Sequence, residues 1–443
     1  MANRCLLAIV SLSVVLRIAA ALYLGNTVTV QPGTADQLSY HTLALRVLGG
    51  HGFSFDTGWW PATPAGEPTA HWSYLYVLFL AVTYAIAGPV PLVARLLQAV
   101  IVGILHPALT YAIARRLFGT RVGLVSAALV AGYAYFIYYA GALMTESFFF
   151  VAVLWSIYVA TGLAADRQQL TASGGWVSLG LALLAAVLLR QAVLVCVPFI
   201  LMWVVWRVMT RDDAAFLGRG QATVLMRGLS VTLMVMVAGI LPWTLRNYRA
   251  FDRFVLLNTN AGFAFYWGNH PIHGRRFIPI LPGDGSIYGR LIPDDLRSRN
   301  EADMDRALLG RGVAFVTADP VRYAALSASR VIEFVKFWPS GESDRVSNVA
   351  RVMSFGVCAP FLLLGVALEI RPGRRRVDGA ERWLVLGVAL VYSLAHILTW
   401  TLVRYRLPAD ALLLPFAALS LVHLADWVAR AARTVRPDLV VTG

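Results

Sequence analysis

Charge is scarce in this chain of 443 residues: only 14% of them are Asp, Glu, Lys or Arg, against about 25% in ordinary soluble domains. Lysine is almost absent, because Lys336 is the only one and every other basic side chain apart from histidine is arginine. Cysteine is rare as well. Cys5, Cys196 and Cys358 lie in apolar stretches without a CxxC or His/Cys metal spacing, so the sequence indicates neither a zinc site nor a disulfide framework.

Hydrophobic residues dominate what is present. They make up 58% of the chain, and the mean hydropathy is +0.65. This composition excludes an ordinary soluble domain, a disordered tail and a secreted disulfide scaffold, and it predicts a polytopic membrane protein. A net charge of +14 would suggest nucleic acid in a soluble protein. Membrane proteins, however, gather arginine in cytoplasmic loops, so we expect membrane lipid and no nucleic acid as a partner.

A membrane span needs about 20 mainly apolar residues, and ten stretches are candidates. They lie near residues 5–24, 91–114, 121–140, 147–164, 174–189, 192–208, 226–245, 350–369, 382–400 and 405–426. The first stretch could be a signal peptide with a cleavage site at Ala19-Ala20-Ala21. We prefer an uncleaved helix, because Arg17 interrupts the apolar run. The expected fold is an all-α membrane protein with about ten transmembrane helices.

The distribution of arginine sets the orientation. With the N-terminus in the cytoplasm and ten crossings, the cytoplasmic pieces hold seventeen arginines and the short outer pieces hold four, which follows the positive-inside rule. A further apolar run, 72–87, would move the Arg115–Arg121 cluster outside if it crossed. We therefore expect 72–87 to lie in the outer interface as an amphipathic or re-entrant helix.

This topology divides the chain into three parts. Residues 1–245 form a transmembrane module whose first outer loop covers 25–90, 246–349 form an outer domain, and 350–443 contain the last spans and a basic cytoplasmic tail.

Within the outer domain the pattern is mixed. Arg253–Thr259 and Gly262–Trp267 look strand-like, whereas 294–318 and 321–338 have helical spacing. We therefore expect a small mixed α/β domain.

Several ionisable residues fall at the outer ends of the spans. In chain order they are Asp36, Glu146, Arg190, Arg246, Arg404 and Arg406. Taken singly, Asp36 could cap a helix, Glu146 could complement a helix dipole, and the arginines could snorkel to the interface, which is the interpretation we favour for Arg406. Taken together, such costly groups at a membrane predict a functional site.

Carboxylates beside arginines at a lipid boundary suit transfer of a sugar from a polyprenyl phosphate. The planar fork of arginine matches phosphate oxygens, and a carboxylate can accept the proton of an attacking hydroxyl. A second carboxylate can orient the acceptor or hold a divalent cation. No ligand spacing demands a metal, so a divalent cation stays open and no other cofactor is expected.

Four groups of short motifs occur in order along nearly the whole chain. They are Asp36-x3-Tyr40 with Gly50-His51-Gly52-Phe53-Ser54, Gly123–Ala131 with Leu143-Met144-Thr145-Glu146, Arg246-Asn247-Tyr248 with Gly268-Asn269-His270-Pro271, and Arg404-Tyr405-Arg406-Leu407-Pro408. In these motifs the chain resembles the GT-C superfamily of polyprenyl-phosphate-sugar-dependent glycosyltransferases. Within it, the chain looks most similar to the bacterial branch related to protein O-mannosyltransferases and lipid A aminoarabinose transferases.

The resemblance implies an inverting transfer with Asp36 as the base or acceptor-orienting carboxylate and Glu146 as its partner. Relatives often carry a basic residue and paired prolines before the interfacial helix, whereas this chain has Thr69-Ala70-His71-Trp72-Ser73. His71 would therefore supply charge only where the pH protonates it. The expected substrate-binding residues are Tyr40, His71, Arg190, Arg246, Asn269, Arg404 and Tyr405.

The sequence thus predicts an integral-membrane glycosyltransferase that moves a sugar from a polyprenyl-phosphate-linked donor to a glycan, lipid or protein acceptor. Its site would face the outer side of the cytoplasmic membrane, where nucleotide sugars are not expected. One alternative is a lipid or solute transporter or flippase, although transporters place ionisable groups near the midplane on broken helices in repeated halves. A non-catalytic membrane assembly protein is a third interpretation.

Overall fold

The structure, a computed structural model, describes residues 1–443 except 211–219, 283–284, 342, 344, 371–378 and 436–443. Seven of the arginines counted for the orientation lie outside the described residues: Arg211, Arg219, Arg371, Arg374, Arg375, Arg376 and Arg436.

The described residues form α-helices joined by turns and by irregular segments such as 49–73. Their bounds are α1 Ala2–Leu24, α2 Asp36–Leu48, α3 Tyr74–Ala87, α4 Pro91–Phe118, α5 Thr120–Gly132, α6 Ala134–Gly141, α7 Glu146–Ala165, α8 Arg167–Thr171, α9 Ser173–Leu189, α10 Cys196–Met209, α11 Gln221–Phe251, α12 Ala261–Asn269, α13 Ser286–Arg290, α14 Glu301–Ala318, α15 Pro320–Val335, α16 Arg345–Arg351, α17 Val357–Ile370, α18 Ala380–Leu398 and α19 Leu407–Val435.

The spans agree with the sequence prediction. Within the described part of the chain, eight helices are long and apolar enough to cross a membrane, and α5 with α6 makes a ninth candidate bent by 54°. Two of the eight combine neighbouring elements: Gln191–Met209 joins a 3-10 turn to α10, and Arg345–Ile370 runs from α16 to α17. Helix α9 is apolar but shorter, with 17 residues. Each of the ten predicted stretches thus corresponds to a helix or a bent pair, and the helical, polytopic membrane fold is confirmed.

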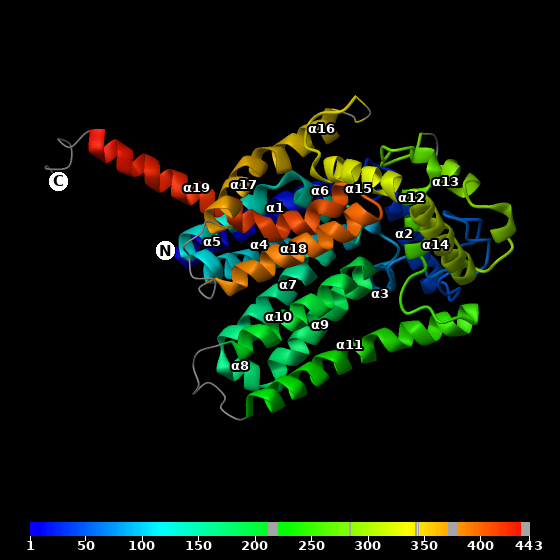
Figure 1. The fold of residues 1–443 in the computed structure, drawn as a ribbon, viewed down its shortest axis with the longest axis horizontal. Coiled ribbons are helices and arrows are strands. Elements are labelled where there is room, and N and C mark those ends of the chain that lie inside the picture. Colours follow the sequence, from blue (N-terminus) through cyan, green and yellow to red (C-terminus); the bar gives the residue numbers. More distant parts are fainter. Residues whose placement is uncertain (211–219, 283–284, 342, 344, 371–378, 436–443) are drawn as a thin grey trace.

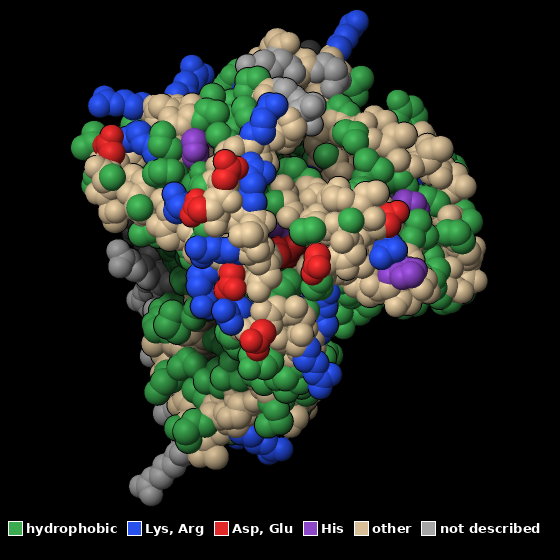
Figure 2. Space-filling view, turned by 90° about the vertical axis from the view of Figure 1, so that its right-hand side faces the viewer, with side chains coloured by type: hydrophobic (Ala, Val, Ile, Leu, Met, Phe, Trp, Pro, Cys, Tyr) green, Lys and Arg blue, Asp and Glu red, His purple; other side chains and the backbone are tan. Residues whose placement is uncertain are grey.

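The molecule has two chemically different ends. Figure 1 shows the long helices side by side, with the N-terminus and α8 at one end and α2, α12 and α14 at the other. Figure 2 looks onto this second end and shows basic and acidic side chains interspersed there. They include the exposed pairs Arg297–Asp294 and Arg311–Asp295. Exposed ion pairs add little stability, but they suit a surface in water.

Helix α3 begins and ends on the same side of the bundle. The hydroxyl of Ser73, which precedes α3, donates to the carbonyl of Leu188 near the end of α9, at 2.9 Å. Soon after α3 ends, the amide of Leu92 donates to Asn26, just past the end of α1, at 3.1 Å. With only 14 residues, α3 fits the predicted interfacial or re-entrant helix of the first outer loop.

The expected strands of the outer domain are absent, and this prediction was wrong. No strand occurs among the described residues; 253–259 are irregular and Gly262–Trp267 lie inside α12. Helix α12 begins here because the amides of Gly262 and Phe263 donate to Asp305 of α14, at 2.8 and 3.1 Å. Its buried aromatic residues recur at helical spacing, a pattern that is ambiguous in so short an apolar run.

The two helices expected in this segment are present as α14 and α15, with a 3-10 turn over Asp294–Leu296 before them. The segment also has an apolar core of its own. Its buried members are Phe263, Tyr266, Trp267, Leu281, Tyr288, Ile292, Leu296, Met304 and Leu308. A helical unit with its own core therefore covers the end of the bundle that carries α2.

Candidate functional site

Asp36 is the first residue of α2, yet its side chain does not cap that helix. The carboxylate instead binds Arg404, with 2.6 Å between Oδ2 and Nη2. The same guanidinium donates from Nη1 to the carbonyl of Gly33 at 3.0 Å. Arg404 therefore fixes both the acid and the turn that leads into α2.

Glu146 opens α7 in the same way, as the first residue of its helix. Its Oε1 lies 2.5 Å from Nη2 of Arg190 and 3.6 Å from Nε of Arg404. Arg190 follows α9 directly, and its Nε donates to the hydroxyl of Thr145 at 3.1 Å. A helix dipole would favour an acid at this position, but the two guanidinium groups are far closer partners.

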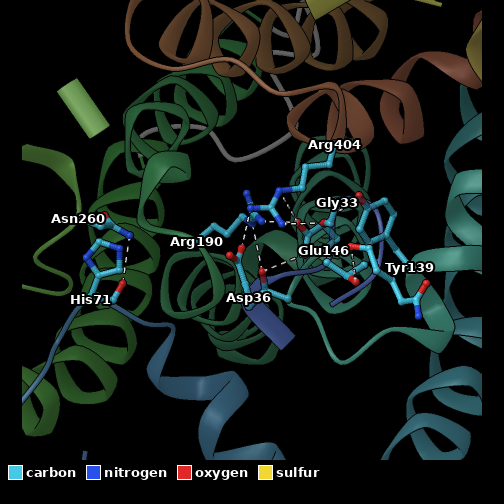
Figure 3. A network of polar contacts seen from close by, with 11 residues as sticks. Gly33, Asp36, His71, Tyr139, Glu146, Arg190, Asn260 and Arg404 are labelled. Atoms are coloured by element: carbon cyan, nitrogen blue, oxygen red, sulfur yellow. Dashed lines mark hydrogen bonds and ion pairs between the residues drawn. The ribbon is translucent and has the colours of Figure 1, made fainter. Parts of the chain in front are cut away.

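Figure 3 shows Asp36, Glu146, Arg190 and Arg404 converging on one point. They come from the start of α2, the start of α7, the end of α9 and the 3-10 turn η6 (Val403–Arg406) before α19. Two carboxylates and two guanidinium groups balance in charge. The aromatic ring of Tyr405 lies 5.1 Å from the Arg190 guanidinium and 5.4 Å from that of Arg404, so it supports both arginines.

The two acids differ in access to water. The side chain of Asp36 is 25% exposed, whereas that of Glu146 is 2% exposed. An incoming hydroxyl can therefore reach Asp36, while Glu146 is enclosed by the arginines. This difference suits a proton acceptor at Asp36 and an orienting or charge-balancing acid at Glu146.

Tyr40 lies one helical turn beyond Asp36 and faces the interior. Its ring packs edge-on against Trp72 and Tyr76, with centroids 5.6 and 5.0 Å apart. Burial, with a smaller contribution from the charge of Asp36, raises the pKa of its phenol. Tyr40 therefore stays protonated and forms the apolar wall behind Asp36.

His71 does not join the charged group, and Figure 3 shows it to one side of it, next to Asn260. The imidazole packs edge-on against Trp60 and Phe263. Burial lowers its pKa below the ordinary value, although Glu301 and Asp36 partly oppose this shift. A neutral imidazole results, so this environment does not favour the cationic role expected from the sequence.

Arg246 and Asn269 also lie outside the charged group and bind the chain itself. Arg246 donates to the carbonyls of Thr69 and Phe53, at 2.8 and 3.1 Å, and so holds the first outer loop on α11. Nη2 of Arg330 donates to Oδ1 of Asn269 at 2.9 Å. Both act here as parts of the scaffold.

Arg406 does not snorkel, contrary to the sequence-based interpretation. It is 2% exposed and pairs with Asp410, at 3.1 Å from Nε to Oδ1. Asp410 was not among the predicted site residues, although its i, i+4 spacing from Arg406 is the signal that could have found the pair. Thr145, which belongs to the Leu143-Met144-Thr145-Glu146 motif, is a further site residue that was not predicted, and it accepts from Arg190.

Among the described residues, no group of three or more His, Cys, Asp or Glu side chains could hold a metal ion. Asp36 and Glu146 are the acids that could contribute to such a site, and both are occupied by guanidinium groups. A divalent cation between them would have to displace Arg404.

Comparison with known proteins gives a partial family match. The family described as dolichyl-phosphate-mannose-protein mannosyltransferase matches residues 72–243. That segment contains α3 and runs to α11, and it includes Glu146 and Arg190 but not Asp36 or Arg404. No curated protein matches the chain.

Solved structures match over nearly the whole chain. The oligosaccharyltransferase AglB from Archaeoglobus fulgidus, in complex with an inhibitory peptide and a dolichol-phosphate, has a TM-score of 0.58 at 16% identity, covering 100% of this chain and 52% of AglB. The apo form of the Archaeoglobus fulgidus oligosaccharyltransferase has the same TM-score at 17% identity, covering 98% of this chain and 52% of that one.

This chain thus spans about half the length of those archaeal enzymes. ArnT from Cupriavidus metallidurans, in the apo state, has a TM-score of 0.39 at 16% identity, covering 94% of this chain and 77% of ArnT. The likeness to the two archaeal structures, at 16% and 17% identity and a TM-score of 0.58, shows a shared fold.

Proposed function

We propose that this chain, which has the fold of the GT-C glycosyltransferases, is an integral-membrane glycosyltransferase that uses a polyprenyl-phosphate-linked sugar. The observation that carries the proposal is the convergence of Asp36, Glu146, Arg190 and Arg404 at one end of the bundle. A solved structure with this fold, the archaeal AglB, is in complex with a dolichol-phosphate.

The two arginines suit the phosphate leaving group of the proposed donor. When the acceptor oxygen attacks the anomeric carbon, the bond from that carbon to the phosphate oxygen breaks, and the electron pair leaves with the polyprenyl phosphate. Arg190 and Arg404 provide positive charge for those oxygens, and fixed guanidinium groups are already oriented for it. Both lie at the outer membrane boundary in the proposed topology, where the phosphate of an embedded lipid carrier would be.

The more exposed acid, Asp36, suits the role of proton acceptor for the attacking hydroxyl. Its proton passes to the carboxylate of Asp36, and attack opposite to the leaving phosphate inverts the anomeric configuration. In the structure Arg404 occupies this carboxylate, with 2.6 Å between Nη2 and Oδ2. A donor phosphate that draws Arg404 toward itself would free Asp36 for the acceptor. The mechanism therefore favours donor binding before proton transfer.

Glu146 completes the charge balance. With 2% exposure and contacts to Arg190 and Arg404, it keeps two neighbouring cations together in the absence of substrate. Like charges at such a distance would otherwise repel. Glu146 therefore orients the phosphate-binding arginines, while the outer segment of residues 246–349 shapes the acceptor side.

A transfer assay tests this proposal directly. Membranes containing the chain are given a panel of radiolabelled polyprenyl-phosphate sugars, and label is followed into the lipid, polymer and protein fractions. We expect label to leave one donor of the panel with the wild-type chain. We expect Asp36→Asn to lower the rate by about 100-fold or more, because general-base catalysis contributes that much. Asn replaces Asp with little change in volume, so expression and melting temperature should hold. Equal rates for the two chains would refute the mechanism.

A further inference from the structure

A second buried ion pair lies beside the site and takes no part in the proposed chemistry. Nε of Arg406 lies 3.1 and 3.2 Å from the two carboxylate oxygens of Asp410. The hydroxyl of Tyr133 donates to the same carboxylate at 2.7 Å. All three residues are at most 3% exposed. A buried ion pair is often no more stabilising than apolar residues of similar volume, so this one calls for another role.

Arg406 is held from several sides. Besides Asp410, its Nη1 donates to the carbonyl of Phe334 near the end of α15, at 2.7 Å. Its guanidinium lies 3.7 Å from the ring centroid of Phe355. Arg404 and Tyr405 belong to the same short turn, η6. Because that turn has only four residues, fixing Arg406 also fixes the direction in which Arg404 and Tyr405 project.

Tyr133 is the hinge residue between α5 and α6, where the chain bends by 54°. The far end of α6 is also held, because the amide of Gln98 donates to the carbonyls of Tyr139, Ala140 and Ala142, at 3.2, 3.0 and 2.7 Å. The short segment that follows α6 leads directly to Glu146. Helix α6 is therefore held at both ends and connects Tyr133 to the segment before Glu146.

Helix α6 is also linked to Arg404 through a shared hydrogen-bond acceptor. The hydroxyl of Tyr139 donates to the carbonyl of Gly33 at 3.3 Å, and the same carbonyl accepts from Nη1 of Arg404 at 3.0 Å. The contacts therefore close on themselves. Starting from Arg404, they pass through Gly33, Tyr139, α6, Tyr133, Asp410 and Arg406, and they return along η6.

We propose that Arg406, Asp410 and Tyr133 are positioning residues that hold Arg404 against Asp36 and Glu146 through this closed ring of contacts. The inference rests on the proposed function, since it assigns these residues to the donor-phosphate side of the same site. None of the three touches the reacting atoms. Loosening the ring should misplace Arg404, so the donor should bind more weakly and react more slowly.

The sharpest variant removes both charges at once. In Arg406→Leu/Asp410→Leu no buried charge is left unpaired, so the melting temperature should stay close to that of the wild type. We expect kcat/KM for the donor to fall by about ten-fold or more, with a higher KM and a lower kcat, which a purely stabilising role would not produce. The matched control is Arg207→Leu/Glu381→Leu, which removes a pair with 3.4 Å between Nε and Oε1 on α10 and α18 and should leave both constants unchanged.

A milder variant keeps the proposal testable if the double variant does not fold. Tyr133→Phe removes one hydroxyl without a change of shape, and we expect a smaller fall in kcat/KM in the same direction. Affinity for undecaprenyl phosphate, measured by its effect on tryptophan fluorescence of the purified protein, should fall in both variants. If the wild type transfers no sugar, the proposed function fails, while this affinity comparison still tests the positioning. Wild-type affinity and wild-type kcat/KM in the folded variants would overturn the inference.

Discussion

Arg404 is the single residue on which the charge balance of the site depends. It contacts Asp36 and the Gly33 carbonyl, and its Nε is 3.6 Å from Glu146. Two hydrogen bonds from one planar group, with a third charge 3.6 Å from its Nε, suit a guanidinium, because an ammonium is a compact charge at the end of a flexible chain. Position 404 therefore requires the planar shape of a guanidinium as well as its positive charge.

We expect Arg404→Lys to raise KM for the donor by roughly ten-fold, the loss of about 1.4 kcal/mol of binding. Lysine keeps the positive charge but cannot bind the acid and the carbonyl in the same geometry. Steady-state kinetics with the donor varied would measure this. Arg115→Lys, a substitution of an exposed arginine at the opposite end of α4 from the site, serves as the control. An unchanged donor KM for Arg404→Lys would show that charge is sufficient.

Helix α14 joins the outer segment to the first outer loop through one buried acid. Glu301, the first residue of α14, accepts from the hydroxyl of Thr63 at 2.9 Å and from the amide of Ala70 at 2.8 Å. The hydroxyl of Thr259 is a third donor to it. Three donors from two distant segments thus share one carboxylate, which keeps the loop before α3 in place.

Glu301→Ala should destabilise the protein by about 3 kcal/mol, because several buried donors would lose their acceptor. Thermal unfolding of the purified protein would measure the loss, and limited proteolysis should then cut the first outer loop faster. Glu301→Gln keeps one acceptor oxygen and should lose less stability. Equal melting temperatures for wild type and Glu301→Ala would contradict this account of the loop.

A second acid on α14 should make stability depend on pH. Burial raises the pKa of Asp305 to about 7 from the ordinary 3.8, although the amides of Phe263 and Gly262 oppose the shift. The folded state therefore binds this proton more tightly than the unfolded state does. The stabilisation from Asp305 is complete below about pH 4 and is lost as the pH rises to about 7.

The melting temperature of the wild type should therefore fall between about pH 4 and pH 7. The melting temperature of Asp305→Asn should fall less, because the Asn side chain cannot ionise. Melting curves of both proteins between pH 4 and pH 8 give the comparison. Parallel curves would mean that Asp305 does not contribute to the pH dependence.

The whole molecule is a helical bundle, and one end of it carries the candidate site and a covering unit. The expected orientation depends on arginine at the opposite end, and part of that arginine lies outside the described residues. Which end faces the cytoplasm is therefore best tested on intact cells.

Single-cysteine variants test the orientation in a background without Cys5, Cys196 and Cys358. We expect Arg276→Cys, exposed in the outer segment, to react with a membrane-impermeant maleimide in intact cells. Arg115→Cys, exposed in the last turn of α4, should react only after the membrane is opened. Mass shifts of the purified variants would report the labelling. The reverse pattern would place the site on the cytoplasmic side and remove the reason for a lipid-linked donor there.

Composition and hydropathy were sufficient for the membrane fold. Spans are set by the cost of placing polar groups in hydrocarbon, so each predicted stretch corresponds to helices at nearly the same positions. The same cost made Asp36 and Glu146 conspicuous at the ends of spans. That cost does not operate in the segment of residues 246–349, and there the local pattern fails. It predicts a strand over Gly262–Trp267, whereas the structure has a helix that begins at a contact with Asp305.

Only the tertiary structure decided which charges meet. Asp36 and Arg404 are 368 residues apart, and nothing local in either segment states that they pair. Arg404 reaches the acids while Arg406, two residues later, turns away to Asp410. Arg246 and Asn269 bind backbone and a neighbouring arginine instead. The sequence determined that costly charges would gather at one boundary of the bilayer, because hydrocarbon excludes them. Their individual partners were decided by helix packing, because a side chain can bind only what the fold brings within its reach.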